Sequence, residues 1–215
     1  CTFRASTITG RQAPPMKRVL LTERLRLRAP QPGDELAAFD GWARDPEVLR
    51  YLGWRPHRAL ADTRAQLDWD QARWLKRSAW TWLLIQQATG RHTSAEPGDS
   101  APHSRGTAIG IVQLIPQRFD GPVHHLRLGC LLTRSRWGQG LMREAVSAVL
   151  AEAFEQTSVW RVDALCDVDN HASARLFDAL GFEHEGVLRR HSLHPNVGDE
   201  PRDVTVHARL RSPGG

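Results

Sequence analysis

Two closely spaced glycines in Trp137-Gly138-Gln139-Gly140-Leu141-Met142 are the residues best suited to chemistry in this chain. They follow an alternating apolar segment and open a segment with helical periodicity. The first turn of a helix carries unpaired N–H groups and the positive end of the helix dipole, and small residues there let a pyrophosphate approach the backbone. The segment therefore predicts either a site for a phosphorylated cofactor or an ordinary strand-to-helix turn.

Other known ligand motifs fit this chain poorly. A P-loop ends in Gly-Lys-Ser/Thr, and no lysine follows these glycines; a dinucleotide-binding loop needs a third glycine where Arg143 stands. The sequence also lacks a His-Glu-x-x-His pattern or a Cys/His cluster, so we expect no metal. The three cysteines have no ligand spacing, and their odd number argues against a disulfide framework, which favours a reducing, cytoplasmic setting.

The elements that must position this loop follow from hydrophobic periodicity. It predicts helices starting near Asp34, over 60–79, after Gly138, and from Asp169 or Asn170 to Gly181. It predicts strands over 19–28, 80–87, 107–115, 123–133, 160–166, 183–191 and 204–210. The polar, Gly- and Ser-containing segment 88–106 is typical of a long loop at the tip of a hairpin. This order predicts one α/β domain in which helices pack on the faces of a mixed sheet.

Composition sets broad limits on function. The chain has 215 residues, of which 40% are hydrophobic and 25% charged, which is ordinary for a soluble globular domain. Its net charge of +5 suits a phosphate-rich cofactor, RNA, or a basic surface without a specific partner, but no aromatic and basic RNA motif occurs, so nucleic acid is not expected. No apolar run approaches the roughly 20 residues of a membrane span, so no membrane partner is expected. Residues 1–16 are expected to be a disordered leader or an added extension, leaving 17–215 as the domain.

Four motifs stand in order along residues 20–210: Leu21-Thr22-Glu23-Arg24-Leu25-Arg26-Leu27-Arg28, Trp137-Gly138-Gln139-Gly140 with Glu144-Ala145, Asn170-His171-Ala172-Ser173, and Leu180-Gly181-Phe182 with Glu185-Gly186. In these motifs the chain resembles the GNAT superfamily of N-acetyltransferases, and within it the RimJ/RimL subgroup that includes ribosomal-protein N-terminal acetyltransferases. The resemblance implies a mostly antiparallel sheet that is splayed at the cofactor site, helices on both faces, and acetyl-CoA (coenzyme A) as co-substrate. The chain departs from the wider superfamily at Trp137 and Met142, where Gln or Arg and Gly or Ala are usual.

Carried over by position, the resemblance implies a set of cofactor contacts. The loop at Trp137 would hold the pyrophosphate through backbone N–H groups of Gly138, Gln139, Gly140, Leu141 and Met142. The strand end Cys130, Leu131 and Leu132 would pair with the pantetheine arm like an added strand, splaying from 160–166, and Gly129 would ease that distortion. Arg134, Arg136 and Arg143 would face either the phosphates or solvent.

Asn170 and Ser173 admit two interpretations. An Asn at a helix start is a good cap, and a Ser three residues later can satisfy early N–H groups without a catalytic role. The resemblance instead implies that Asn170 bonds the pantetheine and that Ser173 protonates the departing thiolate.

Acetyl transfer to an amine makes further demands. The amine attacks only as the neutral base, and an N-terminal α-amine with a pKa near 8 is an easier acceptor than an alkylamine with a pKa near 10.4. The enzyme must remove a proton, polarise the carbonyl and stabilise the thiolate. A backbone N–H near Leu131 or Leu132 is the candidate for the carbonyl. His125 and His191 are candidate bases, directly or through water, and a purely structural role stays open for each.

We therefore predict an N-acetyltransferase that moves acetyl directly from acetyl-CoA to a primary amine, of a peptide or protein N-terminus. No covalent intermediate is expected, because neither Cys130 nor Cys166 has an evident activating base. The alternatives are a small-amine acetyltransferase acting on a polyamine or aminoglycoside, and a non-catalytic acyl-CoA-binding sensor. The acceptor entrance is expected between segment 34–79, with one or two of its tryptophans on the pocket floor, and the loop 194–201. A homodimer is left open.

Overall fold

The computed structural model describes residues 15–87, 106–117 and 122–212, in which eight strands form one sheet. From one edge to the other, the strands are β1 (Val19–Leu21), β2 (Leu25–Arg28), β3 (Trp80–Gln86), β4 (Ala108–Pro116), β5 (His125–Leu132), β6 (Arg161–Asp167), β8 (Arg202–Leu210) and β7 (Glu183–Ser192). All neighbours are antiparallel except β5 and β6. The predicted mixed, mostly antiparallel sheet is therefore confirmed.

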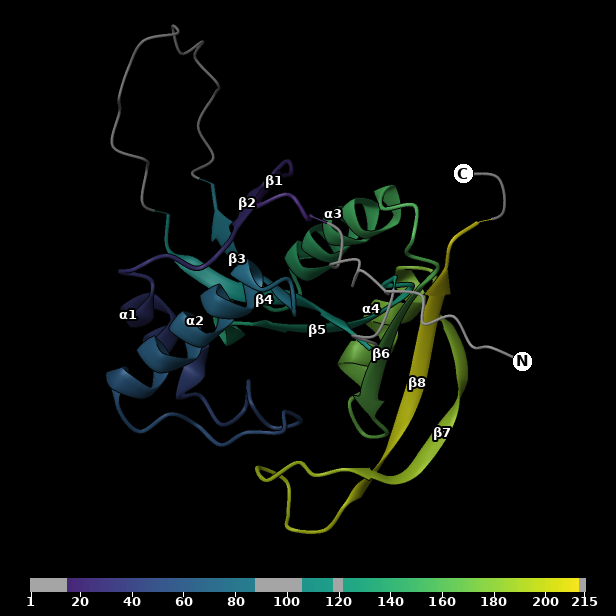
Figure 1. Cartoon of the computed structure of the whole chain (residues 1–215). Helices are drawn as coiled ribbons and strands as arrows, with labels where there is room; N and C mark the ends of the chain where they lie inside the picture. Colours follow the sequence, from purple (N-terminus) through teal and green to yellow (C-terminus); the bar gives the residue numbers. More distant parts are fainter. Residues whose placement is uncertain (1–14, 88–105, 118–121, 213–215) are drawn as a thin grey trace, which may run out of the picture.

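Helices cover both faces of the sheet (Figure 1). One face carries α1 (Glu35–Ala38), the π-helical turn η1 (Phe39–Ala43) and α2 (Leu60–Leu75), and the other carries α3 (Leu141–Glu155) and α4 (His171–Ala179). A short 3-10 turn, η2 (Arg134–Arg136), connects β5 to the loop before α3.

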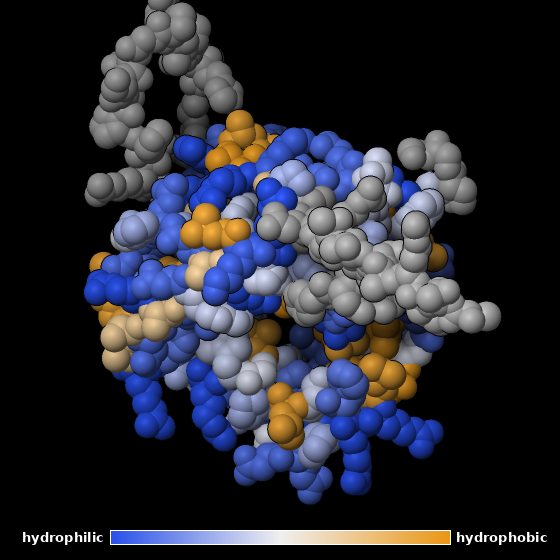
Figure 2. Space-filling view, viewed as in Figure 1, coloured by the Kyte–Doolittle hydropathy of each residue, from blue (hydrophilic) through white to orange (hydrophobic). Residues whose placement is uncertain are grey.

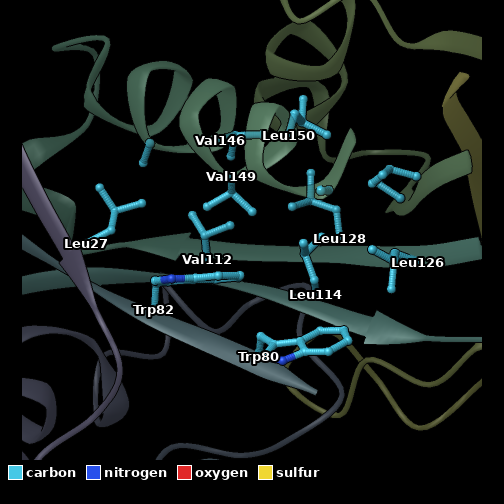
Figure 3. Close-up of a cluster of buried hydrophobic side chains, with 14 of the residues drawn as sticks. Leu27, Trp80, Trp82, Val112, Leu114, Leu126, Leu128, Val146, Val149 and Leu150 are labelled. Atoms are coloured by element: carbon cyan, nitrogen blue, oxygen red, sulfur yellow. The ribbon is translucent and has the colours of Figure 1, made fainter. Parts of the chain in front are cut away.

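A separate hydrophobic cluster lies on each face. The larger packs the apolar stripe of α3, including Val146, Val149 and Leu150, onto Val112 and Leu128 of the central strands (Figure 3). The smaller packs α1, η1 and α2 onto β3 and the end of β5. The period of 3.6 in α3 and the alternation in the strands predicted this packing.

The sheet splits in its middle, between β5 and β6. These strands pair only at His125↔Arg161, Leu126↔Val162 and Arg127↔Asp163, although each continues for several residues. The β4–β5 register runs through Gly129 without a shift. The predicted splay is thus confirmed, but no distortion at Gly129 produces it.

Hydrogen bonds show which backbone groups of β5 face the opening. Thr133 N donates to Ile109 O of the β4 side, whereas His124 O accepts from Arg161 N of the β6 side. Backbone groups alternate along a strand, so those of Leu128, Cys130 and Leu132 face the side that β6 has left.

Two predicted boundaries were wrong. Segment 19–28 is two short strands joined by a turn, in which Thr22 N donates to Leu25 O at 2.9 Å. The predicted helix 60–79 ends at Leu75, before β3. Met16, the last residue of the predicted leader, is buried in the core. Residues 1–14 and the predicted loop tip 88–105 lie outside the described residues.

Figure 2 shows a largely hydrophilic face with apolar side chains in small separate groups and a hollow between the α2 side and the β7–β8 side. No helix among the described residues is long and apolar enough to cross a membrane.

Candidate active site

A cavity of about 510 Å³, open to solvent, lies where β5 and β6 diverge. Its walls are the end of β5, the glycine loop 137–140 and the first turn of α3, the start of α4, and the segment 47–52 before α2. Ten of the predicted site residues line it: Cys130, Leu131, Leu132, Trp137, Gly138, Gly140, Leu141, Met142, Asn170 and Ser173. The structure therefore brings together residues that are up to 43 positions apart in the sequence (173 − 130).

The glycine loop has the backbone that its sequence predicts. Gly138 and Gly140 have φ angles of +73° and +74°, a left-handed conformation that strains other residues. Gly140 is the N-cap of α3, so the unpaired N–H groups of the first turn adjoin the cavity. Gln139 differs from the prediction, since it does not line the cavity; its carbonyl accepts from Arg24 Nη1 at 2.9 Å and its side chain donates to Ser135 O.

Trp137 ties the loop to the end of β5. Its indole Nε1 donates to Leu132 O at 2.7 Å, while the residue stays 46% exposed at the cavity. The Leu132 carbonyl is therefore occupied. Backbone groups of Cys130 and the Leu132 N–H remain on the open side of β5 for an extended ligand arm.

Two of the three predicted arginines reach the cavity. Arg136 and Arg143 line it, whereas Arg134 lies 3.5 Å from Asp45 and does not. Two guanidinium groups beside a helix N-terminus suit a ligand that carries phosphates.

Asn170 acts as the helix cap that its position predicts. Its Oδ1 accepts from Ser173 N at 3.2 Å at the start of α4. The bond uses the backbone N–H of Ser173 and not its hydroxyl, so Ser173 can both be capped and offer a proton to the cavity that it lines.

The structure does not bring His125 to the cavity. His125 begins β5, five residues before Cys130, which at about 3.3 Å per residue places it about 17 Å away. Its Nε2 lies 2.9 Å from Asp163 Oδ2, a carboxylate that Arg127 also contacts. Burial opposes ionisation of Asp163, but these donors outweigh it and lower its pKa to about 2. His125 thus lies against Asp163 and Arg127 and away from the cavity.

His191 does not line the cavity either. It is exposed on the edge strand β7, and its Nδ1 lies 3.1 Å from Ser192 Oγ. The two predicted bases thus lie on different strands, outside the cavity.

Cys166 is buried and Cys130 is partly buried on the cavity wall, and neither thiol is an activated nucleophile. Burial raises the pKa of Cys130 to about 12 and that of Cys166 to about 11, so both are protonated at neutral pH. Among the described residues, no group of three or more His, Cys, Asp or Glu could hold a metal ion.

The segment before α2 and the loop after β7 pack together beside the cavity. Asn196 Nδ2 donates to Leu49 O and to Trp54 O, both at 2.7 Å, and the His194 ring meets Tyr51 edge-on. Sequence patterns named this region but not its cavity-lining members Val48, Arg50 and Leu52, because an irregular segment has no periodicity to orient it.

The expected tryptophan floor is absent from the described cavity walls. Trp42 and Trp74 are buried in the core, Trp54 packs against His57, and Trp69 is exposed beneath Arg73.

Comparisons with known proteins give one consistent family. The family model described as "Acetyltransferase (GNAT) domain" matches residues 24–183. The uncharacterized protein YkkB of Bacillus subtilis is 25% identical over 81% of this chain and 90% of its own length. The uncharacterized N-acetyltransferase p20 of Bacillus licheniformis is 26% identical over 79% and 85%.

Solved structures share the fold at low identity. The ribosomal L7/L12 α-N-protein acetyltransferase RimL, without ligand, has a TM-score of 0.72 at 19% identity and covers 91% of this chain and 95% of its own. The microcin C7 self-immunity acetyltransferase MccE, in complex with acetyl-CoA and AMP, has a TM-score of 0.72 at 14% identity, covering 88% and 94%.

Proposed function

Because the chain belongs to the acetyltransferase (GNAT) family and is an acetyl-CoA-dependent N-acetyltransferase, we propose that its acceptor is the α-amine of a peptide or protein N-terminus. The charge balance of the cavity wall is the observation that carries this proposal. Glu47 Oε1 lies 3.6 Å from Arg50 Nη1, and Asp169 Oδ2 lies 2.5 Å from Arg202 Nη2. With its carboxylates paired, the wall lacks the free negative charge that a polycation such as spermidine or an aminoglycoside would require.

The site has the features that acetyl-CoA requires. The loop N–H groups, Arg136 and Arg143 suit the phosphates, and the free edge of β5 at Cys130 and Leu132 suits the amides of the pantetheine arm. When bound, the co-substrate supplies an activated acetyl thioester. The Leu132 N–H is the backbone donor that we propose for the thioester carbonyl, since Leu131 N–H faces β4 by alternation.

We propose Ser173 as the proton donor to the leaving thiolate. Ser173 is on the first turn of α4 and lines the cavity, and the Asn170 cap engages its backbone N–H and not its hydroxyl. We propose no histidine base, because an α-amine with a pKa near 8 is partly neutral at physiological pH and can lose its proton to water. With Cys130 and Cys166 protonated, transfer is direct.

A panel of acceptors, read by release of free thiol, tests the proposal. It contains short peptides with free N-termini, the same peptides N-acetylated but carrying a lysine, spermidine and kanamycin. We expect a kcat/KM at least tenfold higher for the free N-termini and no turnover of the blocked peptides. Tenfold preference for spermidine or kanamycin would overturn the choice of acceptor, and binding of acetyl-CoA without any turnover would favour the sensor.

One observation favours the small-amine alternative. A second hollow beside the cavity carries the carboxylates of Asp199, Glu200 and Asp203, of which Asp199 lies 3.7 Å from Arg55. This negative charge would attract a cationic amine to the entrance. The same panel decides between the two acceptors.

We propose the cytoplasm as the compartment, since Cys130 and Cys166 are free thiols. A homodimer stays a prediction, which sedimentation of the purified chain would test.

A further inference from the structure

The turn between β1 and β2 is bonded to the first turn of α3, about 120 positions along the chain. Thr22 Oγ1 donates to Glu144 Oε1 at 2.6 Å, and Arg24 N donates to the same oxygen at 2.8 Å. Arg24 Nε donates to Glu144 Oε2 at 2.6 Å. Both carboxylate oxygens of Glu144 are therefore used to hold this turn and, with it, the base of the Arg24 side chain.

The other arm of the Arg24 guanidinium reaches the glycine loop. Its Nη1 donates to Gln139 O at 2.9 Å. The chain contains no cis peptide among its described residues, and in a trans peptide the carbonyl of one residue and the N–H of the next point in opposite directions. With the Gln139 carbonyl held toward Arg24, the Gly140 N–H points away from Arg24. Gly140 lines the cavity and Gln139 does not, as this orientation requires.

Because the loop contains two glycines, its backbone conformation must be fixed by contacts from outside the loop. Gly138 and Gly140 lack side chains that would restrict the backbone, so the peptide between Gln139 and Gly140 can rotate at little cost. Fixing that rotation before a ligand arrives removes an ordering cost from binding.

We propose that Arg24 is a positioning residue that fixes the peptide plane between Gln139 and Gly140, so that the Gly140 N–H is presented to the pyrophosphate of coenzyme A. Glu144 supports it by holding the guanidinium in place. The inference rests on the use of acetyl-CoA and is independent of which amine accepts the acetyl group.

Two substitutions separate the carbonyl contact from the ion pair. Arg24→Lys keeps the charge for Glu144, but a single ammonium lacks the fork that spans Glu144 and the Gln139 carbonyl. Arg24→Gln removes both contacts. The matched control is Arg28→Gln at the end of β2, four residues along the chain, which removes a two-bond ion pair with Asp34 (2.6 and 2.7 Å) that does not touch the loop.

Calorimetric titration with CoA is the primary measurement, because it needs no acceptor. We expect CoA to bind about tenfold more weakly to Arg24→Lys and to Arg24→Gln, the loss of one hydrogen bond to a charged group. Arg28→Gln should bind CoA within about twofold of wild type even if its melting temperature falls. Unchanged CoA affinity in Arg24→Lys, or an equal loss in Arg28→Gln, would overturn the proposal.

A truncated donor gives the second measurement. S-acetylpantetheine carries the thioester but no pyrophosphate, so its KM should be the same for wild type and Arg24→Lys, while the KM for acetyl-CoA rises. A parallel rise for both donors would show general damage to the site and contradict the positioning role. Failure of every donor with every amine, combined with normal CoA binding, would count against the proposed function and leave the role of Arg24 intact.

Discussion

The backbone N–H of Ser173 is bound by the Asn170 cap, and its side-chain hydroxyl is the proposed proton donor. A substitution can therefore remove one group without the other. Ser173 lines the cavity, and Ser173→Ala keeps the backbone N–H that Asn170 caps and removes only the hydroxyl. We expect kcat to fall about a hundredfold, as on loss of a general acid, with CoA affinity within about twofold, because the proton is needed mainly in the transition state. Steady-state kinetics and calorimetry measure the two quantities.

The control is Ser147→Ala, an exposed serine on α3 that does not line the cavity. It should have wild-type kcat. Wild-type kcat in Ser173→Ala as well would leave that residue only its place in the helix cap.

Individual residues were predictable from sequence where local geometry decides their role. Gly138, Gly140 and Asn170 have the conformations or bonds that their places at helix starts require. His125 was not predictable, because its partner Asp163 lies on another strand and only the sheet register brings the two together. A histidine close to a motif in sequence can thus lie at the far end of its strand.

At the scale of elements, the close approach of β4 and β5 beneath the cavity depends on Gly110. A Cβ on Gly110 would lie 2.4 Å from Leu131 O, which real structures do not allow. We expect Gly110→Ala to lose about 1–3 kcal/mol of unfolding free energy, as in overpacked cores, and to weaken CoA binding by shifting the end of β5. Denaturant unfolding and calorimetry measure these effects.

Gly129→Ala is the matched control, since it lies on β5 opposite Gln113 and a Cβ there meets nothing within 4 Å. Its stability should stay within about 0.5 kcal/mol of wild type. Equal stability of the two variants would contradict this account of β4 and β5.

Most elements could be predicted because they are long and periodic, as α3 and β5 are. The break between β1 and β2 could not, since residues 19–28 alternate almost without interruption. The turn there is bonded to Glu144 on a distant helix, so its cause is tertiary. The end of α2 at Leu75 also has a tertiary cause. The chain must leave the helix there to place Trp80 of β3 in the core.

At the scale of the whole molecule, the sheet consists of two parts joined by three residue pairs between β5 and β6. The cavity lies at this junction, with walls from β5 and α3 on one side and from α4 on the other. A ligand that spans it contacts both parts. Binding therefore adds contacts across a junction that only three residue pairs hold.

We accordingly expect acetyl-CoA to raise the melting temperature. A ligand at 100 times its Kd adds about 2.7 kcal/mol, which for a domain of this size corresponds to a rise of about 5–10 °C. ATP and NAD at the same concentration carry adenine and phosphates but no pantetheine arm to pair with the free edge of β5, so they should give much smaller shifts. Scanning calorimetry measures the three shifts.

Amide hydrogen exchange should show the added protection at the end of β5 and the start of α4, because those segments form the two sides of the junction. Equal shifts from all three ligands, or protection confined to the glycine loop, would contradict a ligand that bridges the two parts of the sheet.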